Sequence, residues 1–251
     1  MLRKKRGSFE WLEFELFQEF KQLRQGVFLR HGGISEGPYA SLNTGDNVED
    51  DPSHVRLNRE KIRKHLGCKT LLSGKQVHGD RIIEVQKVTG VECDGLVTQA
   101  KGLGLAVMHA DCQVALFYDP VHQAIGSIHA GWRGNVLNIY EKAVGKMHKE
   151  FGSKPADLLV GISPSLGPCC GEFINYEKEL PQPFWAYQVK PYYFDLWEIS
   201  RSQLLKAGIL PAHLEIARIC TCCNPTDFYS FRRDKPTGRH ATVICLSNDR
   251  Y

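Results

Sequence analysis

The sequence lacks the glycine-rich loops that bind nucleotide phosphates in several large enzyme folds. It contains neither Gly-x-Gly-x-x-Gly nor a Walker-type loop, so folds that bind dinucleotides or nucleoside triphosphates through these loops are disfavoured. It also lacks a long apolar run, because Glu13 and Glu15 interrupt the apolar residues between Trp11 and Phe20 behind a basic start. A signal peptide or membrane span is therefore not expected, and we predict a cytoplasmic protein that contacts no membrane.

A strong excess of one charge is missing as well. The net charge of +4 favours small anionic ligands slightly, but it is far from the dense basic surface of a nucleic-acid binder, so nucleic acid is not an expected partner. The nine cysteines are an odd number and accompany no secretory signal. This favours reduced thiols in a cytosol over a disulfide framework. The sequence does not indicate an oligomeric state.

No low-complexity linker and no internal repeat divides the chain. Its 251 residues, 42% of them apolar, are enough for the core of one large domain. We therefore predict a single domain over residues 1–251, in which residues 1–8 form a loose basic stub.

Hydrophobic periodicity and turn residues predict both helices and strands. Asp51 and Pro52 are typical of a helix start and Gly67 of its end, whereas residues 9–23 fit helix and strand equally. The expected helices cover residues 51–67, 134–151 and 195–208. The expected strands cover residues 103–108, 114–118, 124–128, 158–162, 214–219 and 242–246. Because strands occur both as hairpins and with intervening helices, we predict an α+β (mixed α/β) domain with a mixed sheet flanked by helices.

Three residues that lie far apart in the chain are the candidates for chemistry: His78, Cys112 and His129. Two imidazoles and a thiol are ligands that zinc accepts. Three protein ligands leave a fourth tetrahedral position for water or substrate, as in catalytic zinc sites. Cys112 and His129 lie near the ends of expected strands, where loops commonly carry chemistry on a rigid sheet. The sequence therefore predicts a catalytic metal site made by these three residues.

Motifs from about residue 27 to about residue 246 resemble those of one family. They are Arg30-His31-Gly32-Gly33-Ile34-Ser35, Ser41-Leu42-Asn43, Lys75-Gln76-Val77-His78-Gly79, Asp94-Gly95-Leu96-Val97-Thr98, Ala110-Asp111-Cys112, His129-Ala130-Gly131-Trp132-Arg133-Gly134, Gly167-Pro168-Cys169-Cys170, Cys220-Thr221-Cys222-Cys223, Phe231-Arg232-Arg233 and Gly238-Arg239-His240. The chain resembles the YfiH/YlmD-type proteins, which have been labelled polyphenol oxidase or laccase-domain proteins and later purine nucleoside phosphorylases.

This resemblance implies a fold, an activity and a cofactor. The implied fold is a single compact domain comparable to that of bacterial cysteine-hydrolase toxins, and the implied zinc ligands are His78, Cys112 and His129. The implied activity is phosphorolysis of adenosine, inosine and methylthioadenosine to the free base and ribose 1-phosphate or its methylthio analogue. Adenosine deamination and phenol oxidation are implied beside it. For deamination, a zinc ion that lowers the pKa of water to roughly 7 could supply hydroxide for attack at purine C6.

Phosphorolysis requires a place for inorganic phosphate, and three arginines are candidates. Arg133 lies in a glycine-flanked turn that enters an expected helix, where free N–H groups and the helix dipole favour an anion. The guanidinium groups of Arg232 and Arg233 also match the geometry of phosphate, although a solvated or ion-paired surface role stays open for both. Asn43 is a candidate to bond the ribose or the base.

Other functions stay open on the residues alone. Copper(II) in the same site could oxidise phenols, since it binds such ligands more tightly than zinc, but the ten histidines include no His-x-His pair of the multicopper kind. In a metal-free thiol hydrolase, His78 or His129 would activate Cys112 as a nucleophile. In a binding protein the metal would be purely structural. The stretches Cys169-Cys170 and Cys220 to Cys223 lack zinc-finger spacing and are expected to be structural.

Overall fold

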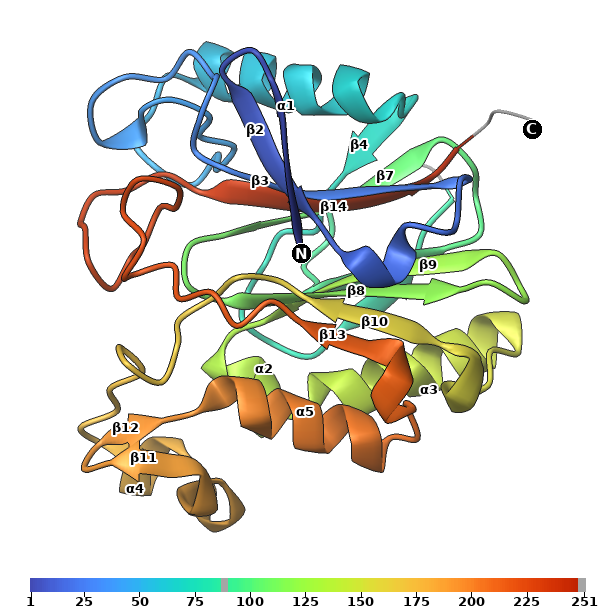
Figure 1. The fold of residues 1–251 in the computed structure, drawn as a ribbon, viewed down its shortest axis with the longest axis vertical. Helices are drawn as coiled ribbons and strands as arrows, with labels where there is room; N and C mark the ends of the chain where they lie inside the picture. The colour runs from blue at the N-terminus through green and yellow to red at the C-terminus, as the bar shows by residue number, and fades with distance from the viewer. Residues whose placement is uncertain (87–89, 248–251) are drawn as a thin grey trace.

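Two mixed β-sheets stack face to face and carry helices on their outer sides (Figure 1). The computed structural model describes residues 1–86 and 90–247. Its strands are β1 (Leu2–Arg6), β2 (Phe9–Glu13), β3 (Leu23–Phe28), β4 (Thr70–Leu72), β5 (Ile82–Glu84), β6 (Gly95–Thr98), β7 (Leu103–His109), β8 (Gln113–Asp119), β9 (Ala124–Ala130), β10 (Leu159–Ile162), β11 (Gln188–Lys190), β12 (Tyr193–Phe194), β13 (Leu214–Ile216) and β14 (His240–Leu246). Its α-helices are α1 (Pro52–Leu66), α2 (Trp132–Val136), α3 (Ile139–Phe151), α4 (Tyr176–Glu179) and α5 (Leu196–Lys206). Short 3-10 helices lie at Glu15–Phe17, Gly37–Tyr39, Pro155–Asp157, Gln182–Tyr187 and Pro211–His213.

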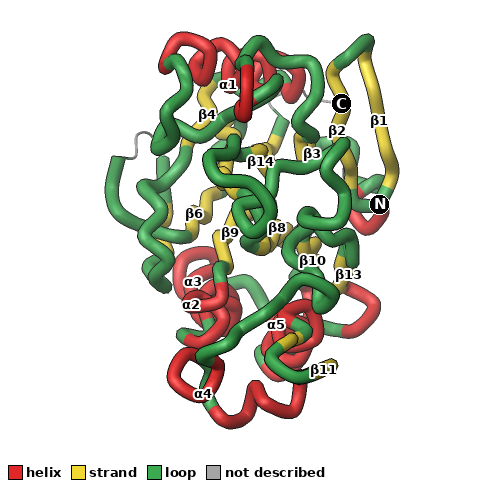
Figure 2. Tube along the Cα trace, turned by 90° about the vertical axis from the view of Figure 1, so that its left-hand side faces the viewer, coloured by secondary structure: helices red, strands yellow, loops and turns green. Residues whose placement is uncertain are grey.

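The two large sheets have six strands each. The first has the order β1-β2-β3-β14-β7-β4 and the second the order β13-β10-β8-β9-β6-β5, while β11 and β12 form a separate pair. Parallel pairing joins β4 to β7, β5 to β6 and β10 to β13, and the other pairs are antiparallel. From top to bottom in Figure 1 the layers are α1, the first sheet, the second sheet, and α3 with α5. Figure 2 shows the same order from the side, with helices at both ends and strands between them. The predicted mixed α/β single domain is confirmed.

Three apolar layers hold this sandwich together. Between the sheets, side chains of the first sheet such as Leu105 and Ile244 pack against side chains of the second such as Leu116 and Ile125. A second cluster places Ile62 of α1 against the outer face of the first sheet. A third cluster covers the outer face of the second sheet with residues of α3 and α5. Burial of these faces is the main favourable term in folding.

Helix α1 forms where the sequence predicts it, for local reasons. The side chain of Asp51 accepts a hydrogen bond from the backbone N–H of Ser53, and Pro52 occupies the first helical turn. Gly67 ends the helix with a φ of 67°, a left-handed conformation that glycine adopts without steric cost. The apolar side chains of Val55 and Ile62 are buried.

Two predicted segments differ in the structure. Residues 1–8 are not a loose stub, because β1 pairs with β2 from Leu2–Glu13 to Arg6–Phe9. Arg3 of this edge strand forms ion pairs with Glu10 at 2.6 Å and with Asp227 at 2.8 Å. The helix predicted over 134–151 is divided into α2 and α3, since Asn138 has a φ of 52°. Asparagine enters the left-handed region more readily than most residues, so the helical hydrogen bonds are interrupted there.

Within residues 1–86 and 90–247, no helix combines the length and apolar composition needed to cross a membrane.

Candidate metal centre

The three predicted ligands lie at points where the chain leaves one sheet for the next layer. His78 lies in the loop that joins β4 of the first sheet to β5 of the second. Cys112 lies in the short connection between β7 of the first sheet and β8 of the second. His129 is near the end of β9, just before α2 begins. The architecture therefore brings together three side chains that are widely separated in the sequence.

The ligand atoms of His78, Cys112 and His129 all lie within 4.8 Å of one another. The two imidazole rings are nearly perpendicular, with centroids 4.9 Å apart. Gly131 keeps the space between them open, because a Cβ at this position would lie 3.1 Å from Cδ2 of His78 and 3.3 Å from Sγ of Cys112. Two imidazoles and one soft thiolate at this separation fit the ligand set and size of a zinc or copper site.

Asp94, just before β6, holds the side chain of His129 and the backbone of the loop that carries His78. Its Oδ1 accepts hydrogen bonds from Nδ1 of His129 at 2.8 Å and from the backbone N–H of His78 at 2.9 Å. Its Oδ2 accepts from the backbone N–H of Gly79 at 2.8 Å. A carboxylate behind a histidine fixes the ring and directs the other nitrogen to the metal, so Nε2 of His129 faces Cys112. No local pattern in the sequence pairs Asp94 with His129, so this role was not predicted.

The electrostatics of the centre favour the thiolate form of Cys112. Burial alone would raise the pKa of this thiol, but the charge of His129 and the hydrogen bonds of both histidines outweigh burial and lower the pKa to about 6. Burial opposes protonation of His129, yet the charge of Cys112 and the hydrogen bond to Asp94 raise its pKa to about 9. Each side chain therefore favours the charged form of the other, and a cation would take the place of the imidazolium proton.

The centre forms part of the wall of a pocket with a volume of about 780 Å³. The pocket extends from His78, Cys112 and His129 to the loop after Gly45 and to residues 71–76. His109 also lines it, but its Nδ1 contacts the carbonyl oxygen of Cys112 and its Nε2 the hydroxyl of Thr242, each at 2.8 Å. Both ring nitrogens of His109 are thus engaged within the protein. This pocket is within the size range of small-molecule sites.

The four predicted substrate residues lie around this region, and in the described part of the chain none of them lines the pocket. Asn43 is buried, and its Oδ1 accepts hydrogen bonds from the backbone N–H groups of Gly45 and Arg239. The exposed Arg133 stacks its guanidinium on the ring of Trp132, with its Cζ 4.4 Å from the ring centroid. Their roles toward a substrate stay predictions.

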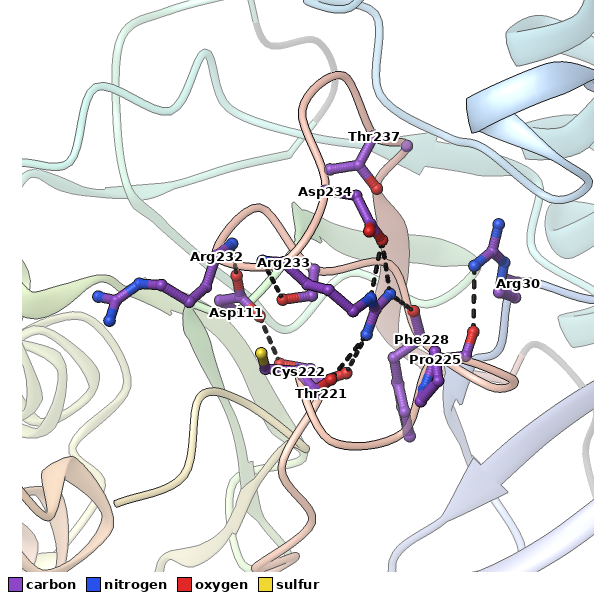
Figure 3. A network of polar contacts seen from close by, with 12 residues as sticks. Arg30, Asp111, Thr221, Cys222, Pro225, Phe228, Arg232, Arg233, Asp234 and Thr237 are labelled. Carbon is purple, nitrogen blue, oxygen red and sulfur yellow. Dashed lines mark hydrogen bonds and ion pairs between the residues drawn. The ribbon is translucent and has the colours of Figure 1, made fainter. Parts of the chain in front are cut away.

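Arg232 and Arg233 have different surroundings (Figure 3). Arg233 directs its guanidinium into a group of carbonyl oxygens. Its Nη1 donates to the carbonyl oxygen of Cys222 at 2.8 Å, and its Nη2 donates to the carbonyl oxygen of Phe228 at 2.9 Å. Arg232 points the other way and donates from Nη1 to the carbonyl oxygen of Cys170 at 2.8 Å. Both side chains brace loops next to the centre, and a role in phosphate binding stays a prediction.

Two pocket residues that were not among the predicted site residues lie in the same loop, before β14. Arg239 and Phe231 line the pocket together with the three metal-site residues. The Nη1 of Arg239 donates to the carbonyl oxygens of Thr237 and Gly238, each at 2.9 Å. Arg239 is half-buried in the pocket wall, and its guanidinium places a positive charge there. Its position in the Gly238-Arg239-His240 motif was the only signal in the sequence.

The fold and the centre together define a two-sheet sandwich with a histidine–cysteine–histidine site at the crossing points between sheets. The chain belongs to the family described as multi-copper polyphenol oxidoreductase laccase, whose sequence model matches residues 24–247. The resemblance to YfiH/YlmD-type proteins is thereby confirmed, and it extends to solved structures.

Relatives in this family carry the name purine nucleoside phosphorylase. Purine nucleoside phosphorylase YlmD of Geobacillus stearothermophilus is 35% identical over 244 residues, which cover 87% of this chain and 88% of that protein. The protein of the same name from Bacillus subtilis is 32% identical over 252 residues, or 90% of each chain. The crystal structure of the hypothetical protein YfiH from Bacillus licheniformis superimposes with a TM-score of 0.86 at 33% identity, covering 98% of this chain and 99% of that one.

Proposed function

We propose that this protein is a zinc-dependent purine nucleoside phosphorylase. It would cleave adenosine, inosine and methylthioadenosine with inorganic phosphate, giving the free base and ribose 1-phosphate or its methylthio analogue, and it would also deaminate adenosine. The proposal depends on one observation above all: His78, Cys112 and His129 converge in the wall of a pocket. The names of the relatives supply the substrate class.

In this proposal each side chain has a distinct task. His78, Cys112 and His129 hold the ion, which when bound supplies a Lewis acid for an oxygen of substrate or water. Asp94 keeps the proton on Nδ1 of His129, so that Nε2 is available as a ligand. The pocket encloses the nucleoside next to the ion, and its walls limit the access of water to the reacting atoms.

For phosphate, the pocket wall favours Arg239 as the binding side chain. A guanidinium presents a planar pair of donors that matches phosphate oxygens. Arg239 lies in the wall next to the exposed ring of Phe231, with its Cζ 5.5 Å from the ring centroid. We propose that Arg239 binds phosphate and that Phe231 packs on the base. Arg133, Arg232 and Arg233 remain proposed contributors, and Asn43 supports the loop through Gly45 and Arg239.

Replacing Arg239 with glutamine is expected to raise the KM for phosphate about 10- to 100-fold, since a charge-assisted hydrogen bond contributes about 1.5–3 kcal/mol. The KM for the nucleoside should change much less. Initial rates over a range of phosphate concentrations measure both constants. Arg133→Gln is the comparison variant, because Arg133 is exposed and stacked on Trp132. A larger rise in the KM for phosphate in Arg133→Gln would instead place the anion at the start of α2.

The proposed reaction is tested by incubating the purified protein with adenosine and phosphate and measuring adenine, inosine and ribose 1-phosphate. We expect adenine and ribose 1-phosphate in equal amounts, inosine as a second product, and loss of all three after treatment with a zinc chelator. Adenine formed equally well without phosphate would show hydrolysis instead. If phosphorolysis and deamination both continued in metal-free protein, the assignment of zinc would be wrong.

Two specific observations support other candidates. The family description refers to copper and to polyphenols, so copper in the same centre could support phenol oxidation. Metal content of protein purified without added copper, compared with the rate of phenol oxidation, separates this function from the first. The lowered pKa of Cys112 beside His129 also suits a thiol nucleophile. Trapping of Cys112 by an electrophile in active, metal-free protein would favour that mechanism.

A further inference from the structure

A second group of metal-ligand side chains lies outside the pocket. It consists of four cysteines, Cys169, Cys170, Cys220 and Cys223, whose Sγ atoms all lie within 4.8 Å of one another. Sγ of Cys223 is 3.4 Å from that of Cys169 and 3.5 Å from that of Cys170. Within residues 1–86 and 90–247, this group and the His78–Cys112–His129 centre are the two clusters with such ligand atoms that close together.

The cysteines come from two loops that the backbone holds side by side. Ser165 and Cys220 form a parallel β-bridge. The backbone N–H of Ser165 donates to the carbonyl oxygen of Ile219, and the backbone N–H of Thr221 donates to the carbonyl oxygen of Ser165. The backbone N–H of Gly167 donates to Sγ of Cys220 at 3.3 Å. A Cβ on Gly167 would lie 3.0 Å from Cβ of Cys220, so glycine permits this close approach. The loops are thus placed by their own backbone contacts.

Packing alone does not explain why four thiols meet here. Buried cysteine serves as a small apolar residue, but within this cluster only Cys220 is buried. Cys169 and Cys223 are exposed, and Cys170 is intermediate. All four are free thiols, and the sulfur–sulfur distances of 3.4 Å and 3.5 Å are far beyond the bond length of about 2.05 Å in a disulfide. A polar function that uses all four sulfurs therefore accounts for the arrangement better than core packing does.

The geometry fits a single tetrahedral ion. A zinc–sulfur bond of about 2.3 Å gives sulfur–sulfur edges of about 3.8 Å in a tetrahedron, close to the spacing of these thiols. Iron–sulfur clusters hold several metal and sulfide atoms between their cysteines, which needs more room than this group has. Four protein ligands complete the tetrahedron, which is the mark of a structural rather than a catalytic zinc.

We propose that Cys169, Cys170, Cys220 and Cys223 bind a structural zinc ion that joins two loops beside the catalytic pocket. This assignment replaces the packing role that their sequence spacing suggested. It does not depend on the proposed phosphorolysis, because it concerns a separate set of ligands and its test counts metal ions rather than product.

Both joined loops contact Asp111, the residue before Cys112. The N–H of Leu166 donates to the carbonyl oxygen of Asp111 at 2.8 Å. From the second loop, the hydroxyl of Thr221 donates to Oδ1 and the N–H of Arg232 to Oδ2 of Asp111, at 2.6 Å and 2.7 Å (Figure 3). The ion would therefore hold rigid the loops on which the position of Cys112 depends.

The test is the zinc content of protein purified under reducing conditions, measured by mass spectrometry for metals together with protein concentration. We expect two zinc ions per chain in the wild type, one in Cys223→Ser, one in Cys169→Ser and one in Cys112→Ser. Cys169 and Cys223 are exposed, so their serine variants should fold. Cys222→Ser is the matched control, since Cys222 lies in the same loop but outside the group of four, and it should retain two ions.

Substitution with cobalt(II) provides an independent reading of the ligands. Thiolate-to-cobalt charge-transfer bands should be strong in the Cys112→Ser variant, where the four-cysteine site alone retains sulfur ligands, and should weaken sharply when Cys223→Ser is added. Two zinc ions in Cys223→Ser, or one zinc ion in the wild type that Cys112→Ser removes, would overturn the proposal. A disulfide between Cys223 and either Cys169 or Cys170 in wild-type protein that holds one zinc would overturn it too. Loss of zinc from Cys222→Ser but not from Cys223→Ser would show that the ligand set is wrong.

Discussion

Replacing Cys112 with serine is expected to lower the rate of phosphorolysis by more than about 100-fold. Loss of a side chain that only orients a metal ligand typically costs 10- to 100-fold, and the loss of a ligand itself should cost more. The thiolate is the sole anionic ligand in the proposed centre, and a hydroxyl is a poor substitute for a soft sulfur. Rates with adenosine and phosphate, together with zinc content, measure both effects.

The stability of the same variant separates a catalytic from a structural metal. Because two sheets and three apolar layers hold the fold, the midpoint of thermal unfolding of Cys112→Ser should stay close to that of the Cys222→Ser control. An unfolded Cys112→Ser protein, with the control folded, would indicate that the centre is needed for folding. A folded Cys112→Ser protein with full activity would remove Cys112 from the chemistry altogether.

Replacing Asp94 with asparagine is expected to weaken zinc binding at the His78–Cys112–His129 centre about 10- to 100-fold. An amide oxygen carries no charge to hold the Nδ1 proton of His129. The amide N–H₂ group is itself a donor, so it cannot accept from the N–H groups that now donate to Asp94. We also expect a loss of about 3 kcal/mol in the free energy of unfolding, because the removed carboxylate is buried and hydrogen bonded. Competition with a chelator of known affinity measures the first effect and denaturant titration the second.

Asp119 offers a matched control for this variant. It is equally inaccessible, accepts hydrogen bonds from the backbone N–H groups of Val121 and His122, and contacts Nδ1 of His122 at 2.8 Å. It lies at the opposite end of β8 from Cys112. Asp119→Asn should therefore lose similar stability and keep its zinc affinity. Equal zinc affinity in the two variants would mean that Asp94 supports the fold without orienting a metal ligand.

The elements that could be predicted from the sequence are those with local causes. The start and end of α1 follow from Asp51, Pro52 and Gly67, whose backbone preferences and capping bonds act within a few residues. The apolar runs of β7, β8 and β9 are bounded by turns, and the structure places strands at all three. Burial of a continuous apolar run between two layers is a property that each run carries in its own composition.

Elements with distant causes could not be predicted in this way. β1 is basic, and its place at a sheet edge depends on Glu10 in the adjacent strand and on Asp227 near the other end of the chain. The break between α2 and α3 could not be read from the apolar spacing, which continues across Asn138. Only the conformation of that one residue separates the helices.

The sequence by itself determined which residues carry ligand chemistry, because thiols and imidazoles are properties of single side chains and the motifs around His78, Cys112 and His129 are local. Tertiary structure alone decided which other groups join these three residues or meet elsewhere. It placed Asp94 behind His129, Arg239 in the pocket wall, and two loops with paired cysteines side by side. These placements follow from strand order and from crossings between sheets, which are set by the burial of whole faces rather than by spacing along the chain.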